Sequence, residues 1–390
     1  MAIVKNMATL RSIYLAAGIS SAALFALMAP STAQELKIGV SISTTGQGAA
    51  LGIPERNTIT LFPEQIGGVK IKVIQLDDAG DPTTATTNAR RLITEDKVDV
   101  IVGSSITPAT IAVANVAFEA GVPHFALAPM PVAAGKEKWT VVLPQPVGLM
   151  AKALFEHMKK NKVTTVGLIG FSDSWGDLWV KSFKDIGEPM GLKMVADERY
   201  ARADTSVAGQ ALKLMSINPD AVLVAGSGTA AALPQIALRE RGYKGPIYQT
   251  HGAVTKDFIK IAGKAAEDSI LASGPVVAAE LQADTALTKK PGVAYVTAYE
   301  GKYGKDTRTQ FGAHMWDTLQ LLNRVIPIAI KKAAPGTAEF RDAIRVALET
   351  EREIAASQAV YNFTPTNRYG VDDRARILIT VKNGEWAVIK

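Results

Sequence analysis

One segment, residues 99–121, constrains the fold of this 390-residue chain more than any other. It begins with an apolar run at 100–102, which is typical of a strand that a parallel sheet buries on both faces. Thr107 with Pro108 then predicts a helix N-cap with proline at the first helical position, and Gly121 can close that helix. The segment therefore predicts a strand that turns into a helix N-terminus, where free N–H groups and the helix dipole favour a carboxylate or phosphate. A simpler interpretation is that Thr107 only caps its own helix.

The same alternation of strand and helix occurs in two runs, residues 36–130 and 151–263. Three extended segments are candidate crossings between the runs: residues 140–146, 270–279 and 360–362. Residues 376–389 predict a closing hairpin. Strands that alternate with helices predict parallel sheets with right-handed crossovers. We therefore predict an α/β chain of two Rossmann-like lobes with parallel sheets, joined by three hinge strands.

The first 33 residues have the features of a signal peptide. Lys5 and Arg11 form a basic start, residues 13–30 are apolar, and the Ser-Thr-Ala sequence at 31–33 resembles a cleavage site. We therefore predict that residues 1–33 direct export and are removed; an uncleaved anchor is the alternative. No later stretch is long and apolar enough to span a bilayer. The remaining chain is too long for one small core, which favours two domains.

Composition and missing motifs argue against several classes of function. The net charge of +6 is spread along the chain without a basic block, so a nucleic-acid partner is not expected. The absence of cysteine excludes thiol catalysis and cysteine-based metal sites. The acidic loop at 77–81 lacks the EF-hand spacing, which favours a capped loop over a metal site. Walker A, H-E-x-x-H and G-x-S-x-G motifs are missing, and the glycines at 226–228 lack the third glycine of the dinucleotide fingerprint. We predict no enzyme activity, no cofactor and no metal.

Small, hydroxyl and aromatic residues gather where the predicted strands end. In open α/β sheets, ligands bind outside the carboxyl ends of the strands. The strand ends are residues 44–48, 104–107, 128–130, 172–175, 226–229 and 250–251. These ends predict a ligand cleft between the lobes, and capping chemistry alone is the alternative. Trp175 lies in a polar turn, and His251 could donate to a carboxylate or hydroxyl. His124 is interpreted as a satisfied strand residue, and His157 and His314, on predicted helices, carry no signal.

Several motifs carry a resemblance to a known family over residues 36–390. They are a T-G-x-x-A-x-x-G loop (Thr45, Gly46, Ala49, Gly52), DDAGDPTTATTNARRLITEDKVDVIVG, FEAGVPHFALAP, FSDSWG, IAGKAAED and WDTLQLL. The chain resembles the type I periplasmic binding proteins of the branched-chain amino acid class, which feed ABC transporters. The resemblance implies hinge closure around one solute, a periplasmic location, an ABC permease as partner and a monomer. We expect an N-terminal lobe of residues 34–147 plus 278–358, and a C-terminal lobe of 148–277 plus 359–390.

The family's binding residues can be transferred by position. The hydroxyl that holds the ligand carboxylate falls on Thr107, the carbonyl that accepts the ammonium falls on Ala128, and the aromatic over the ligand falls on Trp175. Two positions depart from the pattern, because Met130 replaces a hydroxyl and His251 replaces an acid. A tyrosine expected near 228–229 is missing. The predicted ligand-binding residues are Leu51, Ser105, Thr107, Ala128, Met130, Trp175, Gly228, Thr229 and His251.

The two departures predict the class of ligand. A buried ammonium needs an anionic partner, and Met130 and His251 remove the expected one. A thioether, an indole and an imidazole suit an apolar or aromatic body, with a ring hydroxyl for His251. We therefore predict a small organic carboxylate, most simply an aromatic acid, as in the similar binding proteins for benzoate- and cinnamate-type acids. The alternatives are a branched-chain or other aliphatic amino acid receptor, a sensor module of the same fold, and an enzyme.

Overall fold

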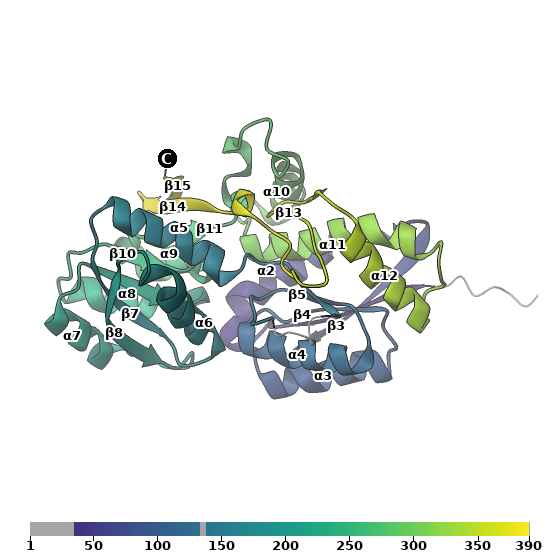
Figure 1. Ribbon diagram of the computed structural model, residues 1–390, viewed down its shortest axis with the longest axis horizontal. Helices are drawn as coiled ribbons and strands as arrows, with labels where there is room; N and C mark the ends of the chain where they lie inside the picture. Colours follow the sequence, from purple (N-terminus) through teal and green to yellow (C-terminus); the bar gives the residue numbers. More distant parts are fainter. Residues whose placement is uncertain (1–34, 133–137, 390) are drawn as a thin grey trace, which may run out of the picture.

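The computed structural model describes residues 35–132 and 138–389, which form two α/β lobes side by side (Figure 1). The two lobes confirm the predicted fold class. The predicted signal peptide, residues 1–33, lies outside the described residues. In the described part of the chain, no helix is both long and apolar enough to cross a bilayer.

The first lobe is built on a six-stranded sheet in the order β2-β3-β1-β4-β5-β6. Its strands are β1 (Leu36–Ile42), β2 (Gln65–Ile66), β3 (Val69–Asp77), β4 (Val100–Gly103), β5 (His124–Ala126) and β6 (Thr140–Val142). All pairings are parallel except that of β2 with β3. Helices α2 (Ala49–Ile59), α3 (Pro82–Thr94), α4 (Thr107–Ala120), α11 (Gln310–Ala329) and α12 (Ala338–Thr350) belong to this lobe. Apolar residues of α3 and α4 pack in one core cluster, and those of α11 and α12 pack in another.

The second lobe is built on a seven-stranded sheet in the order β15-β14-β11-β10-β9-β7-β8. Its strands are β7 (Thr165–Phe171), β8 (Lys193–Tyr200), β9 (Ala221–Ala225), β10 (Ile247–Gln249), β11 (Ile270–Ser273), β14 (Ile377–Lys382) and β15 (Glu385–Val388). Helices α5 (Val147–Lys160), α6 (Ser174–Ser182), α7 (Ala208–Ile217), α8 (Ala232–Glu240) and α9 (Lys256–Ala262) complete it. The last two strands pair antiparallel, as the predicted hairpin requires.

The segment that dominates the sequence folds as predicted except at the start of its helix. Strand β4 is fully buried at the middle of the first sheet, and α4 ends where Gly121 adopts a left-handed φ of 65°. The N-cap is Ile106 rather than Thr107, because Ile106 is still extended and Thr107 already has helical geometry. Within the described residues, no side chain caps this end of α4. The helix therefore presents its free N–H groups beside the carboxyl end of β4.

Two of the three expected segments, 140–146 and 270–279, contain a crossing between the lobes, although each begins as a strand of a sheet, and the third, 360–362, does not. Residues 140–142 form the edge strand β6, and 270–273 form β11 inside the second sheet. Val360–Tyr361 is β13, which pairs with β12 (Ile354–Ala355). Short extended apolar runs look alike whether they join a sheet or bridge two lobes, which explains the difference.

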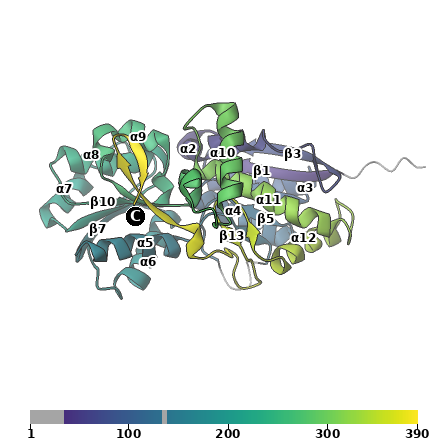
Figure 2. The same cartoon turned by 90° about the horizontal axis from the view of Figure 1, so that it is seen from above.

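Core packing shows where the chain passes from one lobe to the other. Leu143 packs in the first core and Val147 in the second. At the last passage, Ala375 packs in the first core and Ile379 in the second, and this final segment spans the gap in Figure 2. Residues 359–375 thus pack with the first lobe, although we expected them in the second. The exact lobe boundaries stay a prediction.

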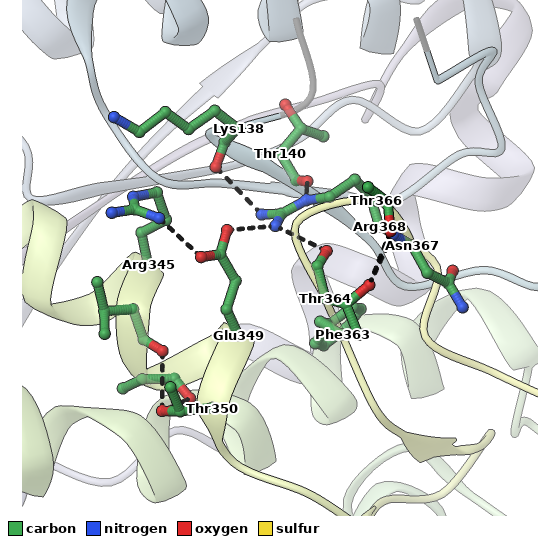
Figure 3. Close-up of polar contacts among 12 residues, drawn as sticks. Lys138, Thr140, Arg345, Glu349, Thr350, Phe363, Thr364, Thr366, Asn367 and Arg368 are labelled. Carbon is green, nitrogen blue, oxygen red and sulfur yellow. Dashed lines mark hydrogen bonds and ion pairs between the residues drawn. The ribbon is translucent and has the colours of Figure 1, made fainter. Parts of the chain in front are cut away.

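A buried ion pair fixes part of the returning chain to the first lobe (Figure 3). The side chain of Arg368 is 1% exposed, and its Nη1 lies 2.6 Å from Glu349 Oε1 on α12. Its Nε donates to the carbonyl of Thr140 at 2.7 Å, which ties it to β6. Glu349 also pairs with Arg345, at 2.7 Å, so its carboxylate contacts two guanidinium groups, and Arg345 pairs in addition with Asp342 at 2.7 Å.

Candidate functional site

A small cavity lies between the lobes and is lined from both sides. The first lobe contributes residues at the ends of β4 and β5 and on α11, and the second contributes residues that follow β7, β8, β9 and β10. The cavity therefore lies at the carboxyl ends of the strands, where the sequence predicted a ligand cleft.

The predicted ligand-binding residues divide into two groups. Those that line the cavity are Leu51, Ser105, Thr107, Ala128, Trp175 and His251. Met130, Gly228 and Thr229 do not line it. The Met130 backbone is bonded to the hydroxyl of Tyr369 through both its N–H and its carbonyl. Gly228 packs against Leu51 across the lobes, since a Cβ there would lie 3.1 Å from Leu51 Cδ1.

The Thr107 hydroxyl serves the cavity wall rather than its own helix. It donates to the carbonyl of Pro129 at 2.7 Å and so links the start of α4 to the end of β5. The interpretation of Thr107 as a helix cap is therefore corrected. Because this bond uses the single hydroxyl proton, a ligand carboxylate at this position would depend on other donors.

Arg202 brings a buried positive charge to the cavity, and the sequence analysis missed it. Its Nε donates to Asp173 Oδ2 at 2.6 Å and its Nη1 donates to Ser227 Oγ at 3.0 Å. Its guanidinium also lies over the ring of Phe171, 4.1 Å from the ring centre. These bonds use two of the five N–H groups of an arginine, so donors remain for an anion. The strand-end rule would have found Arg202 if the end of the strand at 193–200 had been included.

His251 and Trp175 form the aromatic wall of the second lobe. Their ring centres are 5.1 Å apart in an edge-to-face arrangement, and Trp175 Nε1 donates to the carbonyl of Gly226 at 3.1 Å. The His251 side chain is buried, and neither of its ring nitrogens has a hydrogen-bond partner among the described residues. Buried polar groups are normally paired, so these two nitrogens are available to bond a ligand in the cavity.

Helix α11 supplies two further cavity residues that its sequence did not reveal. Phe311 and His314 both line the cavity from the first lobe. His314 Nε2 lies 3.2 Å from Gln358 Nε2, while its Nδ1 has no partner among the described residues. Only the tertiary fold shows that this face of α11 meets the cavity, so no local pattern could have selected His314.

Three buried histidines should make the stability of the protein depend on pH. Burial lowers the pKa of His124 to about 4 and that of His251 and His314 to about 3. An unfolded histidine has a pKa of about 6.5, so below that pH the unfolded chain binds protons that the folded chain does not. Above pH 6.5 these histidines therefore do not lower the free energy of unfolding. Between pH 6.5 and 4 the free energy of unfolding should fall as the pH falls, by up to about 1.4 kcal/mol per pH unit for each histidine.

Urea unfolding at pH 7.5, 6.0 and 5.0 measures this slope. His124 serves for the comparison because it is a satisfied core residue, as predicted, bonded to the carbonyl of Gly103 and to Thr140 Oγ1. The variant His124→Gln keeps a donor and an acceptor but cannot titrate, so its slope should be shallower than that of the natural protein. Equal slopes in the two proteins would contradict the assignment of His124.

Comparisons with known proteins identify the family to which a chain with this cavity belongs. A family described as periplasmic binding protein matches residues 35–369. A Leu/Ile/Val-binding protein homolog 7 from Brucella suis biovar 1 (strain 1330) is 28% identical over 309 residues, which cover 75% of this chain and 76% of the relative. An extracellular ligand-binding receptor from Rhodopseudomonas palustris HaA2 is 63% identical, with a TM-score of 0.90 and coverage of 91% of this chain and 100% of that chain.

A leucine-binding protein from Thermotoga maritima MSB8 shares the fold at 22% identity, with a TM-score of 0.78 and coverage of 91% of this chain and 98% of that chain. The family match covers both lobes and the strand ends that line the cavity. The chain therefore belongs to the periplasmic binding protein family, whose members are non-enzymatic solute receptors with the type I two-lobed fold.

Proposed function

We propose that this chain is the periplasmic receptor of an ABC importer and that it binds a small aromatic carboxylate between its lobes. Residues 1–33 direct it to the periplasm, and the monomer delivers its ligand to an ABC permease in the inner membrane. The observation that carries the choice of ligand is the set of polar groups that line the cavity: Arg202 lines it with N–H groups to spare beyond its pair with Asp173, and no carboxylate of the described residues lines it.

The cavity lining favours an acid without an amino group. A buried ammonium loses several kcal/mol of hydration unless an anion meets it, whereas a carboxylate can use the free N–H groups of Arg202. Trp175 and Phe311 offer flat apolar surfaces for an aromatic body. The unpartnered nitrogens of His251 and His314 suit a ring hydroxyl, which can both donate and accept.

The names of the curated relatives favour a second candidate, a receptor for leucine, isoleucine or valine. Matched ligand pairs decide between the two. 3-Phenylpropanoate and phenylalanine differ only in the amino group, and so do 4-methylpentanoate and leucine. Isothermal titration of residues 34–390, unfolded and refolded to remove any bound solute, gives the four dissociation constants.

We expect 3-phenylpropanoate to bind at least about 100-fold more tightly than phenylalanine, because an unpaired buried ammonium costs several kcal/mol. At 100 times its dissociation constant it should stabilise the protein by about 2.7 kcal/mol in a thermal melt. A hydroxylated cinnamate should bind more tightly than cinnamate itself. Tighter binding of leucine than of 4-methylpentanoate would establish the amino acid receptor instead.

A further inference from the structure

A second carboxyl group lies directly behind the cavity wall. Glu55, on α2, is fully buried, and its Oε2 lies 2.5 Å from Ser105 Oγ. Ser105 in turn lines the cavity and accepts a hydrogen bond from the backbone N–H of Ser43 at 3.0 Å. The other Glu55 oxygen, Oε1, is buried without any hydrogen-bond partner among the described residues. Glu55 does not itself line the cavity, so it can reach a ligand only through Ser105.

The proton on Glu55 decides what Ser105 can offer to a ligand. A serine hydroxyl has one proton and two lone pairs. When Glu55 is ionised, Ser105 donates its proton to the carboxylate and presents only a lone pair to the cavity, which repels an anion. When Glu55 is neutral, its O–H and the N–H of Ser43 occupy both lone pairs of Ser105 Oγ. The Ser105 proton is then free to donate into the cavity.

The surroundings of Glu55 disfavour its charged form. Burial raises the pKa of the Glu55 carboxyl well above its usual range, and the nearby Asp78 raises it further, against the lowering effect of the Ser105 hydrogen bond. Arg56, its neighbour on α2, is exposed. An ionised Glu55 thus has no buried cation to balance it on the described elements that pack around α2. Two described helices beside α2 carry other buried titratable groups, namely α11 and α10 (Lys289–Tyr303). These groups are His314 and Asp317 on α11 and Tyr295 and Tyr299 on α10. None of the four is a cation at neutral pH.

We infer that Glu55 is a positioning residue that stays protonated in the ligand-bound protein and turns Ser105 into a hydrogen-bond donor for the ligand carboxylate. The inference rests on the proposed function, because it needs an anionic ligand beside Ser105. It makes binding proton-linked: the affinity for an acid falls when the pH rises high enough to ionise Glu55. Binding above that pH takes up one proton, which neutralises Glu55 and leaves the ligand as a carboxylate.

Isothermal titration with 3-phenylpropanoate at pH 6, 7, 8 and 9 tests the inference. For the natural protein we expect the dissociation constant to rise toward the alkaline end, by up to about tenfold per pH unit. Titrations at pH 8 in phosphate and in Tris should give different heats, because proton uptake draws on the buffer. In Glu55→Gln the amide N–H₂ replaces the O–H as donor to Ser105, so affinity should no longer vary with pH and the two buffers should give equal heats. The exposed Glu64→Gln is the control and should keep the natural pH profile.

The outcomes separate this inference from the proposed function. An affinity of the natural protein that is constant from pH 6 to 9, with equal heats in both buffers, overturns the role of Glu55 and leaves the receptor for an acid intact. A pH profile of Glu55→Gln that matches the natural one also overturns it. If 3-phenylpropanoate fails to bind at any pH, the proposed ligand class fails and this inference fails with it. If Glu55→Gln does not fold, the pH profile and the two buffer heats of the natural protein still decide whether binding takes up a proton.

Discussion

Replacing Arg202 with methionine is expected to weaken the binding of 3-phenylpropanoate by about 30-fold or more. Removing one partner of a buried, hydrogen-bonded charge pair costs about 2–5 kcal/mol of binding free energy. Methionine keeps an apolar side chain of similar length but removes the guanidinium that lies over Phe171, and with it every N–H. Isothermal titration of the variant measures the loss, and Arg202→Lys, which keeps the charge without the planar fork, should lie between the two proteins.

Two controls make the Arg202 result specific. Arg199 lies on β8 in the same lobe and pairs with Asp177 and Asp197 without lining the cavity, so Arg199→Met should bind the acid as the natural protein does. The neutral 3-phenylpropanamide should bind the natural protein weakly and Arg202→Met almost equally weakly. If Arg202→Met still prefers the acid to the amide by the natural ratio, the carboxylate is held elsewhere, and the free N–H groups at the start of α4 become the first place to look.

Replacing Glu349 with glutamine should destabilise the fold by about 3–5 kcal/mol. The change removes the carboxylate that lies 2.6 Å from the buried Arg368 guanidinium, and breaking one side of a buried pair has an effect of this size. Urea unfolding measures it as a lower midpoint with an unchanged slope. The double variant Glu349→Leu with Arg368→Met should recover much of the loss, because an apolar pair of similar volume removes the buried charges together.

A second paired glutamate gives the matched control for Glu349. Glu353 pairs with Arg374 at 2.8 Å, but both side chains are about half exposed. Exposed pairs contribute little because water and salt screen them, so Glu353→Gln should leave the unfolding midpoint nearly unchanged. Equal effects of the two substitutions would mean that burial does not set the strength of these ion pairs.

The local parts of this fold were predictable because each rests on few neighbouring residues. The strand at 100–102, the helix end at Gly121 and the closing hairpin all follow from apolar runs and turn residues that act over a short stretch. The same local reasoning placed Trp175 and His251 in the cavity, because both follow the carboxyl end of a strand.

The remaining features depend on contacts between distant parts of the chain. Arg202 and His314 line the same cavity from different lobes, and no sequence pattern within either segment predicts that they do. Thr107 looked like a helix cap because its partner, the carbonyl of Pro129, lies 22 residues away. The crossing expected at 360–362 was misplaced for a different reason, since this extended run pairs with residues 354–355 instead of bridging the lobes.

The interlaced path of the chain also determines when each half of the molecule can be finished. Strand β14 lies between β11 and β15, and its Ile379 and Val381 pack beside Phe258 and Leu271. A chain emerging from the ribosome therefore carries an incomplete second lobe until β14 and β15 have been made, even though domains tend to fold from the N-terminal end onward. That delay defers the closing of the second core, and with it the wall of the cavity that this lobe supplies, until both strands have joined the sheet.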